Sequence, residues 1–242
     1  MTSQDQKQIV AQIREHLLPH CFNAAVKAGA AIMKIYKNAD DYDISLKSDH
    51  TPITIADKMA HNTIKECLGP TRIPVLSEEG REMLYDERRN WEMFLLVDPL
   101  DGTKEFIKGN NEFTVNIALM MNNECIASAL YVPYHQKMYV AAKGLGAYLI
   151  RDVEPKEDSS LNQKEIEHLL ERLPLESASH EEFRVAVSRS HQTPETHDRI
   201  DQIRQQHPDL KLIEQGSSYK FCLLAEGTID YYVRTTNTYE YV

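Results

Sequence analysis

The 242-residue sequence lacks the features that mark nucleic-acid-binding, secreted and membrane-spanning proteins. It carries 27 lysines and arginines against 37 aspartates and glutamates, and its basic residues do not gather in a run. This balance argues against nonspecific binding to nucleic acid or to an anionic membrane. No apolar stretch approaches the roughly 20 residues of a transmembrane segment, and the polar N-terminus lacks the apolar core of a signal peptide. We expect a cytoplasmic location, with peripheral association at the inner face of the cell membrane left open.

Cysteine and glycine are too scattered for two other common kinds of site. Cys21, Cys67, Cys125 and Cys222 lie far apart and form no Cys-x-x-Cys pair, so we interpret them as reduced, buried side chains. The turn at 143–146 is not a phosphate-binding glycine loop, because no Lys-Ser/Thr pair follows its glycines. What remains is an ordinary globular composition, with 42% hydrophobic residues and enough chain for a substantial core.

Hydrophobic periodicity predicts an α/β protein with two halves. A charged, serine-rich stretch at 151–161 separates an N-terminal α+β half, 1–150, from a C-terminal α/β half, 151–242. The first half includes an antiparallel meander over 113–150. Helices are expected over 4–18, 20–37, 52–68, 163–173, 194–206 and 219–225, and strands over 42–46, 73–76, 93–97, 113–120, 126–132, 138–142, 147–150, 183–188, 210–213 and 229–233.

Two acids follow directly on the most apolar of these strands, 93–97. The strand ends at Asp98, and open α/β sheets bind ligands at such carboxyl ends. Pro99 has no N–H and a fixed φ, so it can hold Asp98 and Asp101 convergent while the Leu100 carbonyl has no obvious partner. Two carboxylates and a carbonyl are the oxygen donors that hard cations such as magnesium prefer.

The next two residues suit a phosphate. Gly102 and Thr103 can open a helical turn whose N–H groups bind a phosphate oxygen. The alternative is an Asx-type turn that only caps a helix, which is the usual meaning of Asp-x-x-Asp-Gly. The pattern alone leaves both interpretations open.

Three further places offer candidate ligands, each with a plainer alternative. Ser-Glu-Glu-Gly at 77–80 repeats the order of strand, acids and glycine, although adjacent acids usually mark a solvated turn. Asp57 lies near a helix start, where the helix dipole favours an acid. Ser-Arg-Ser-His at 188–191 and the pair Ser217 and Lys220 suit a second anionic group or simple capping.

These segments together resemble the signature blocks of the magnesium-dependent, lithium-sensitive inositol monophosphatase superfamily. Lys-Glu-Phe at 104–106 and the blocks at 188–191 and 216–222 are similar to its CysQ-type branch, the 3'(2'),5'-bisphosphate nucleotidases. The resemblance runs from about residue 21 to the end and implies a layered α/β/α/β/α sandwich. Its other blocks are Leu-Ser-Glu-Glu at 76–79, Asp-Pro-Leu-Asp-Gly-Thr at 98–103 and Glu-Phe-Thr-Val-Asn-Ile-Ala-Leu at 112–119.

The resemblance also implies a role for individual residues. Magnesium would be bound by Glu78, Asp98, the Leu100 carbonyl and Asp101. Catalysis would rest on Asp57 paired with Thr103, which together polarise the attacking water. The implied substrate is 3'-phosphoadenosine 5'-phosphate, cleaved to AMP and phosphate in a step linked to sulfate assimilation. Its ligands would be Gly102, Thr103, His191, Ser217, Lys220 and Arg234. The oligomeric state is left open.

The last residues depart from the family pattern. Relatives carry Trp-Asp-Thr-Ala-Ala-Gly a few residues after the arginine matched by Arg234, and its aspartate binds metal. Without gaps, Tyr241 and Val242 fall on that Trp and Asp. We therefore expect a truncated, incomplete C-terminal half, with Glu240 as a substitute carboxylate only in a shifted register. Two alternatives stay open: an inactive relative that at most binds nucleotide or metal, and an inositol or sugar phosphate monophosphatase.

Overall fold

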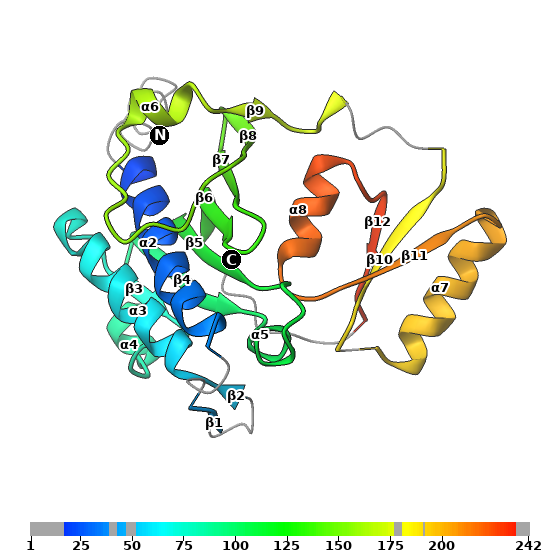
Figure 1. Ribbon diagram of the computed structural model, residues 1–242, viewed down its shortest axis with the longest axis horizontal. Coiled ribbons are helices and arrows are strands. Elements are labelled where there is room, and N and C mark those ends of the chain that lie inside the picture. Colours follow the sequence, from blue (N-terminus) through cyan, green and yellow to red (C-terminus); the bar gives the residue numbers. More distant parts are fainter. Residues whose placement is uncertain (1–16, 39–42, 47–51, 177–180, 191, 236–242) are drawn as a thin grey trace.

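The computed structural model stacks helices and sheets in five layers (Figure 1). It describes residues 17–38, 43–46, 52–176, 181–190 and 192–235. Helices α2 (Leu18–Tyr36) and α3 (Ile55–Leu68) cover one face of a seven-stranded sheet. Helix α8 (Tyr219–Glu226) lies between that sheet and a three-stranded one, and α7 (Pro194–Gln206) covers the outer face. The layered α/β/α/β/α prediction is therefore confirmed.

The larger sheet contains the predicted meander. Its strand order is β3-β4-β5-β6-β7-β8-β9, with β3 parallel to β4 and every other neighbouring pair antiparallel. Asn122 and Asn123 turn the chain between β5 and β6 with φ of 51° and 63°, a left-handed region that asparagine tolerates. The strands are β3 (Val75–Ser77), β4 (Met93–Asp101), β5 (Thr114–Met121), β6 (Glu124–Val132), β7 (Lys137–Ala142), β8 (Gly146–Ile150) and β9 (Glu171–Arg172).

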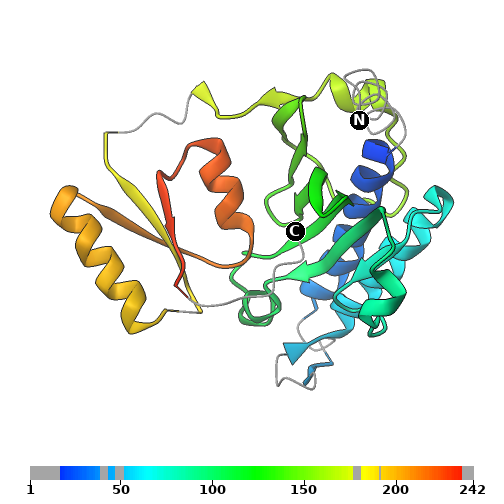
Figure 2. The same cartoon turned by 180° about the vertical axis from the view of Figure 1, so that it is seen from behind.

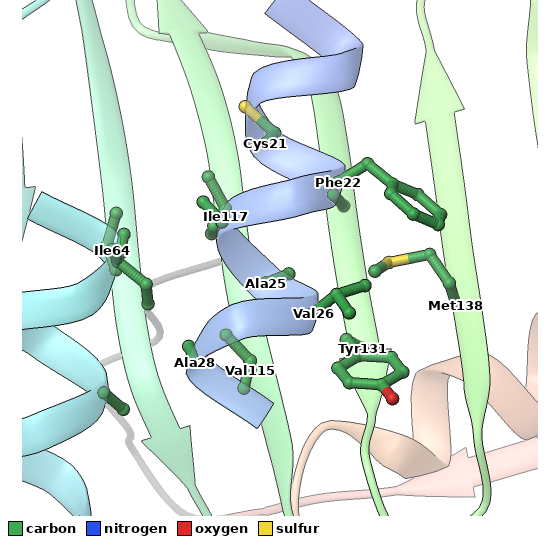
Figure 3. Packing of buried hydrophobic residues seen from close by; sticks show 14 of the residues in the cluster. Cys21, Phe22, Ala25, Val26, Ala28, Ile64, Val115, Ile117, Tyr131 and Met138 are labelled. Carbon is green, nitrogen blue, oxygen red and sulfur yellow. The ribbon is translucent and has the colours of Figure 1, made fainter. Parts of the chain in front are cut away.

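The main core lies between the α2 and α3 layer and this sheet. The apolar stripe of α2 packs on β5, β6 and β7, as Figure 3 shows for Phe22, Val26, Ile117, Tyr131 and Met138. Each fully buried side chain of this size contributes about 1.5–3 kcal/mol. Helix α2 begins at Leu18 rather than at residue 20, because proline in the first turn of a helix removes only an N–H that has no intrahelical partner. The rest of the helix predicted over 4–18 lies outside the described residues.

The smaller sheet carries the other half of the chain. Its strands β10 (Arg184–Ser188), β11 (Lys211–Gln215) and β12 (Tyr231–Val233) are parallel in the order β11-β10-β12. Ile200 and Ile203 of α7 pack on its valines. On the opposite side, Tyr219 and Cys222 of α8 pack on the larger sheet, so α8 joins the two sheets, also when viewed from behind (Figure 2).

Local corrections concern short elements. Pro52 starts β2 (Pro52–Ile53), paired with β1 (Ser45–Leu46), rather than a helix, because Thr54 caps α3 at Ile55. The helix predicted over 163–173 ends early as α6 (Gln163–Glu167), since residues 171–172 pair with β8. Other short pieces are η3 (Gly69–Thr71), α4 (Tyr85–Arg88) and α5 (Thr103–Lys108). None of the described helices combines the length and apolar composition needed to cross a membrane.

The cysteine prediction is partly wrong. All four thiols are free, and Cys21 and Cys222 are buried as expected. Burial raises the pKa of the Cys21 thiol to about 12. Cys67 is half-buried, however, and Cys125 is exposed because it lies at the start of β6, next to a turn. The division of the chain at residue 150 stays a prediction; the segment after it still reaches the main core through Val153 and Ile166.

The contact between α2 and β6 predicts a sensitive position. A Cβ at Gly29 would lie 2.4 Å from Cε1 of Tyr131. Alanine favours a helix over glycine by about 0.5–1 kcal/mol, but overpacking a core costs about 1–3 kcal/mol. Gly29→Ala should therefore lower the free energy of unfolding, measured by urea denaturation. Gly69→Ala is the control, because no atom lies within 4 Å of its Cβ position. Equal unfolding midpoints for the two variants would contradict this packing.

Candidate active site

Parallel pairing brings two predicted metal ligands to the same end of the larger sheet. Ser77 of β3 is in register with Val97 of β4, and the N–H of Glu78 donates to the Val97 carbonyl at 3.0 Å. Glu78, the first residue after β3, therefore lies beside Asp98 of the neighbouring strand β4. Glu78 is half-buried and Asp98 is only 9% exposed.

The turn after Asp98 is an Asx-type turn and is followed directly by helix α5. The Leu100 N–H donates to Asp98 Oδ1 at 3.2 Å, which is an Asx-type contact. Pairing with β5 is irregular between Asp98 and Asp101, so the strand bulges where the two acids lie. The Leu100 carbonyl was expected to lack a partner, but the Thr103 hydroxyl lies 3.3 Å from it. A carbonyl oxygen has two lone pairs, so this contact leaves room for a second donor or a cation.

The predicted pair of Asp57 and Thr103 is present. The Thr103 hydroxyl donates to Asp57 Oδ1 at 2.9 Å, although the two residues are 46 positions apart. The other oxygen, Oδ2, accepts from the Thr54 N–H at 2.7 Å and from the Thr54 hydroxyl at 2.6 Å. Asp57 is 1% exposed. A buried carboxylate is tolerated only when it is well hydrogen-bonded, and these three donors meet that requirement.

The loop at the start of α8 closes the site from the smaller sheet. Gly102 has a φ of 92°, and a Cβ there would lie 3.0 Å from the Ser217 Cβ. The Ser218 N–H donates to Asp101 Oδ2, and its hydroxyl contacts the Thr114 hydroxyl at 2.7 Å. Ser218 occupies the N-cap position of α8, but its side chain does not cap the helix, because its hydroxyl contacts Thr114 of β5. The hydroxyl of Ser217 instead accepts a hydrogen bond from the Tyr219 N–H. Residues from both halves meet at Asp101 and Gly102.

Two predicted substrate ligands share a neighbour that the sequence did not single out. Lys220 is 2% exposed, and its Nζ donates to the Ser217 carbonyl at 2.5 Å and lies 5.4 Å from the centroid of the Tyr232 ring. Arg234 Nη1 donates to the Tyr232 hydroxyl at 3.2 Å. Alternation along the last strand was the available signal, since it puts Tyr232 and Arg234 on one face. His191 lies outside the described residues, as does the stretch 236–242 with Glu240, Tyr241 and Val242.

Two more polar contacts near the site were missed. His61 Nδ1 lies 2.8 Å from the Ser77 hydroxyl, directly before Glu78. Burial, together with Lys65, lowers the pKa of His61. Arg189, which the sequence offered as a donor for an anion, instead binds Glu112 through two nitrogens. Both contacts join residues that are far apart in the sequence. Such residues look the same in the sequence whether they contact each other or are solvated, so neither contact could be predicted.

The predicted magnesium ligands fit the ion by chemistry. Glu78, Asp98, Asp101 and the Leu100 carbonyl supply only oxygen donors, as magnesium prefers. Within the described ranges, however, no three or more His, Cys, Asp or Glu side chains converge in a group that could hold a metal ion. The metal role of these residues therefore stays a prediction.

Gly102 tests how tightly the two halves meet. Gly102 and Gly144 both have positive φ, of 92° and 82°. A Cβ at Gly102 would lie 2.9 Å from the Glu112 carbonyl oxygen, whereas no atom lies within 4 Å of one at Gly144. Gly144→Ala should lose only the conformational cost, about 1–2 kcal/mol, and Gly102→Ala a further 1–3 kcal/mol or so in urea denaturation. Equal losses of unfolding free energy in the two variants would show that the Glu112 carbonyl and Ser217 do not crowd Gly102.

The sequence is similar to a family of known proteins. The chain matches the model of the inositol monophosphatase family over residues 13–241. The 3'(2'),5'-bisphosphate nucleotidase CysQ of Salmonella typhimurium is 39% identical over 220 residues, which are 90% of this chain and 80% of that protein. The protein of the same name from Escherichia coli K12 is 38% identical over the same shares.

The fold is also similar to solved structures. The crystal structure of CysQ from Bacteroides thetaiotaomicron, a bacterial member of the inositol monophosphatase family, matches with a TM-score of 0.78 and 43% identity, over 88% of this chain and 77% of that one. The suhB protein of Bartonella henselae matches with a TM-score of 0.65 over 86% of this chain and 74% of that one. Its 22% identity supports the shared fold alone.

Proposed function

The chain belongs to the inositol monophosphatase family, and from that premise we propose that it is a magnesium-dependent 3'(2'),5'-bisphosphate nucleotidase. Its substrate would be 3'-phosphoadenosine 5'-phosphate, hydrolysed to AMP and phosphate in a step linked to sulfate assimilation. The hydrogen bond between Asp57 and Thr103 is the observation that carries the proposal, because it holds a hydroxyl at the end of β4 beside the acids. The names of the CysQ relatives support the substrate class.

The first catalytic task is to orient the attacking water. The Thr103 hydroxyl hydrogen is directed to Asp57, so the hydroxyl oxygen can accept a hydrogen bond from that water. Because Oδ2 of Asp57 is held by Thr54, the carboxylate cannot rotate away. The water oxygen forms a new P–O bond as the 3' ester P–O bond breaks, and the departing ribose oxygen takes up one proton in exchange for the one that the attacking water gives up. No covalent phosphoenzyme is required.

The second task is to compensate the charge of the phosphate. Glu78, Asp98, the Leu100 carbonyl and Asp101 would hold magnesium, which when bound neutralises phosphate charge and lowers the pKa of a bound water. The acids lie at strand ends and are oriented by the backbone, as the Leu100 N–H orients Asp98. Preorganised ligands of this kind do not need to rearrange during the reaction.

The third task is to bind the rest of the nucleotide. Gly102 and Thr103 are proposed to contact the reacting phosphate, and Ser217, Lys220, Arg234 and His191 the other phosphate and the nucleoside. Lys220 and Arg234 both contact Tyr232, which keeps the two cations near the same side chain. The acids that would hold magnesium come from the first half of the chain, and the basic residues Lys220 and Arg234 come from the second. This arrangement suits a substrate with two separated phosphates, one bound by the metal and one by the basic residues.

Substrate class is tested by phosphate release. We expect release from 3'-phosphoadenosine 5'-phosphate with magnesium, inhibition of that release by lithium, and loss of release when EDTA removes the metal. Inositol 1-phosphate should be a poorer substrate, because it offers no second phosphate to Lys220 and Arg234. Release from inositol 1-phosphate alone would move the substrate class, and release from neither compound would reject the nucleotidase.

Asp98→Asn tests the metal role. The amide has the same shape and can still accept from the Leu100 N–H, so the fold should hold while a charged oxygen ligand is lost. We expect phosphate release to fall by about 100-fold or more, in line with loss of a preorganised charge in a catalytic site. Asp86→Asn is the control, since Asp86 is an exposed residue of α4 that pairs with Arg89. Turnover of Asp98→Asn at the rate of that control would reject the assignment.

A further inference from the structure

We propose that Glu112 and Arg189 are positioning residues whose ion pair sets residues 214–218, the end of β11 and the turn before α8, here together called the loop, against Asp101 and Gly102. The pair joins the segment before β5 to the end of β10, and so one half of the chain to the other. Its effect on substrate binding rests on the function proposed above. The position of the loop itself does not.

The ion pair has the geometry of a strong contact. Arg189 Nη2 lies 2.7 Å from Glu112 Oε1, and Arg189 Nε lies 3.0 Å from Glu112 Oε2. Two parallel bonds from a guanidinium to a carboxylate fix orientation as well as distance. The Glu112 side chain is only 12% exposed, so its charge depends on this partner far more than an exposed acid would.

Glu112 binds the loop directly as well. Its Oε2 accepts from the Gly216 N–H at 2.7 Å. Arg189 Nη2 also donates to the Glu214 carbonyl at 2.7 Å, so both members of the pair hold main-chain atoms of the same loop. Gly216 fits only without a side chain, because a Cβ there would lie 2.2 Å from Cγ of Glu105 and 3.0 Å from Glu112 Oε2. The ion pair therefore fixes the main chain at Glu214 and Gly216, where the loop begins, and we call this set of contacts the clamp.

The clamped loop continues straight into the candidate site. Two residues after Gly216, the Ser218 N–H donates to Asp101 Oδ2. Ser217 lies against Gly102, and the Glu112 carbonyl lies beside the same glycine. A shift of the Glu112 carboxylate would therefore move the donor that orients Asp101 and the side chain of Ser217 together.

Arg189 acts through this loop rather than on a ligand. Three of its nitrogens are directed to acceptors of Glu112 and Glu214. The hydrogen bonds that Arg189 donates to Glu112 raise the pKa of Arg189 further, so the guanidinium stays charged across the accessible pH range. Next to it, the Ser190 hydroxyl donates to Glu105 Oε1 at 2.6 Å, which adds a contact between the end of β10 and α5.

The experiment compares Arg189→Lys, Glu112→Gln and a matched control. Lysine keeps the charge but cannot form the fork, and glutamine keeps the shape but loses the charge. Arg151→Lys is the control, because Arg151 also pairs with a carboxylate, that of Glu171, but through Nε alone and at an exposed position on the larger sheet. Hydrogen–deuterium exchange of residues 214–220 and the KM for 3'-phosphoadenosine 5'-phosphate at saturating magnesium are measured for each protein.

We expect exchange over 214–220 to rise about tenfold in Arg189→Lys and more in Glu112→Gln, while β5 and β6 keep their protection. The KM should rise about tenfold with kcat changed less than about threefold, and Arg151→Lys should match the unaltered protein on both readouts. Unchanged exchange over 214–220, or a uniform rise across both sheets with unchanged KM, would overturn the proposal. If the unaltered protein has no nucleotidase activity but exchange of the loop is still faster in Arg189→Lys and Glu112→Gln, only the proposed function is rejected, and the role of the ion pair in positioning the loop is supported.

Discussion

The buried carboxylate of Asp57 is the constraint around which the candidate site is built. Removing an ion from water costs several kcal/mol unless it is fully hydrogen-bonded, and here the donors are Thr54 and Thr103. Thr54 and Asp57 begin α3, whereas Thr103 follows β4, so the contact that stabilises the charge also sets that helix against the end of the strand. The same hydrogen bond holds the Thr103 hydroxyl in place. Stability and proposed chemistry therefore depend on one pair of side chains.

The two halves of the molecule make unequal contributions to that site. The larger sheet supplies the acids at the ends of β3 and β4, held by strand pairing and a large core. The smaller sheet has a small core of its own, and its hold on the site passes through α8 and the loop before it. Buried polar contacts fix how the halves meet, among them the ion pair between Lys137 and Glu226. The ion pair between Glu112 and Arg189 is the one that lies beside the loop before α8.

The sequence predicted those parts of the structure that local patterns determine. Alternation over 113–150 gave the meander, and the 3.6-residue period gave α2 and α3, because burial of one face leaves a periodic trace. The order of strand and acid placed Glu78 and Asp98, whereas the pairing of Asp57 with Thr103 came only from the family resemblance. Contacts such as His61 with Ser77 left no trace, because their partners are chosen by tertiary proximity and not by spacing.

The acids near the end of β4 differ in the contacts that orient them, and this difference fits the tasks proposed for them. Backbone N–H groups of Leu100 and Ser218 donate to Asp98 and Asp101. Glu112 is paired with a guanidinium. A carboxylate that is paired with arginine gains less from attracting a divalent cation, because the arginine charge repels the cation. Glu112 therefore belongs to the frame of the site, although it lies next to Gly102 in space.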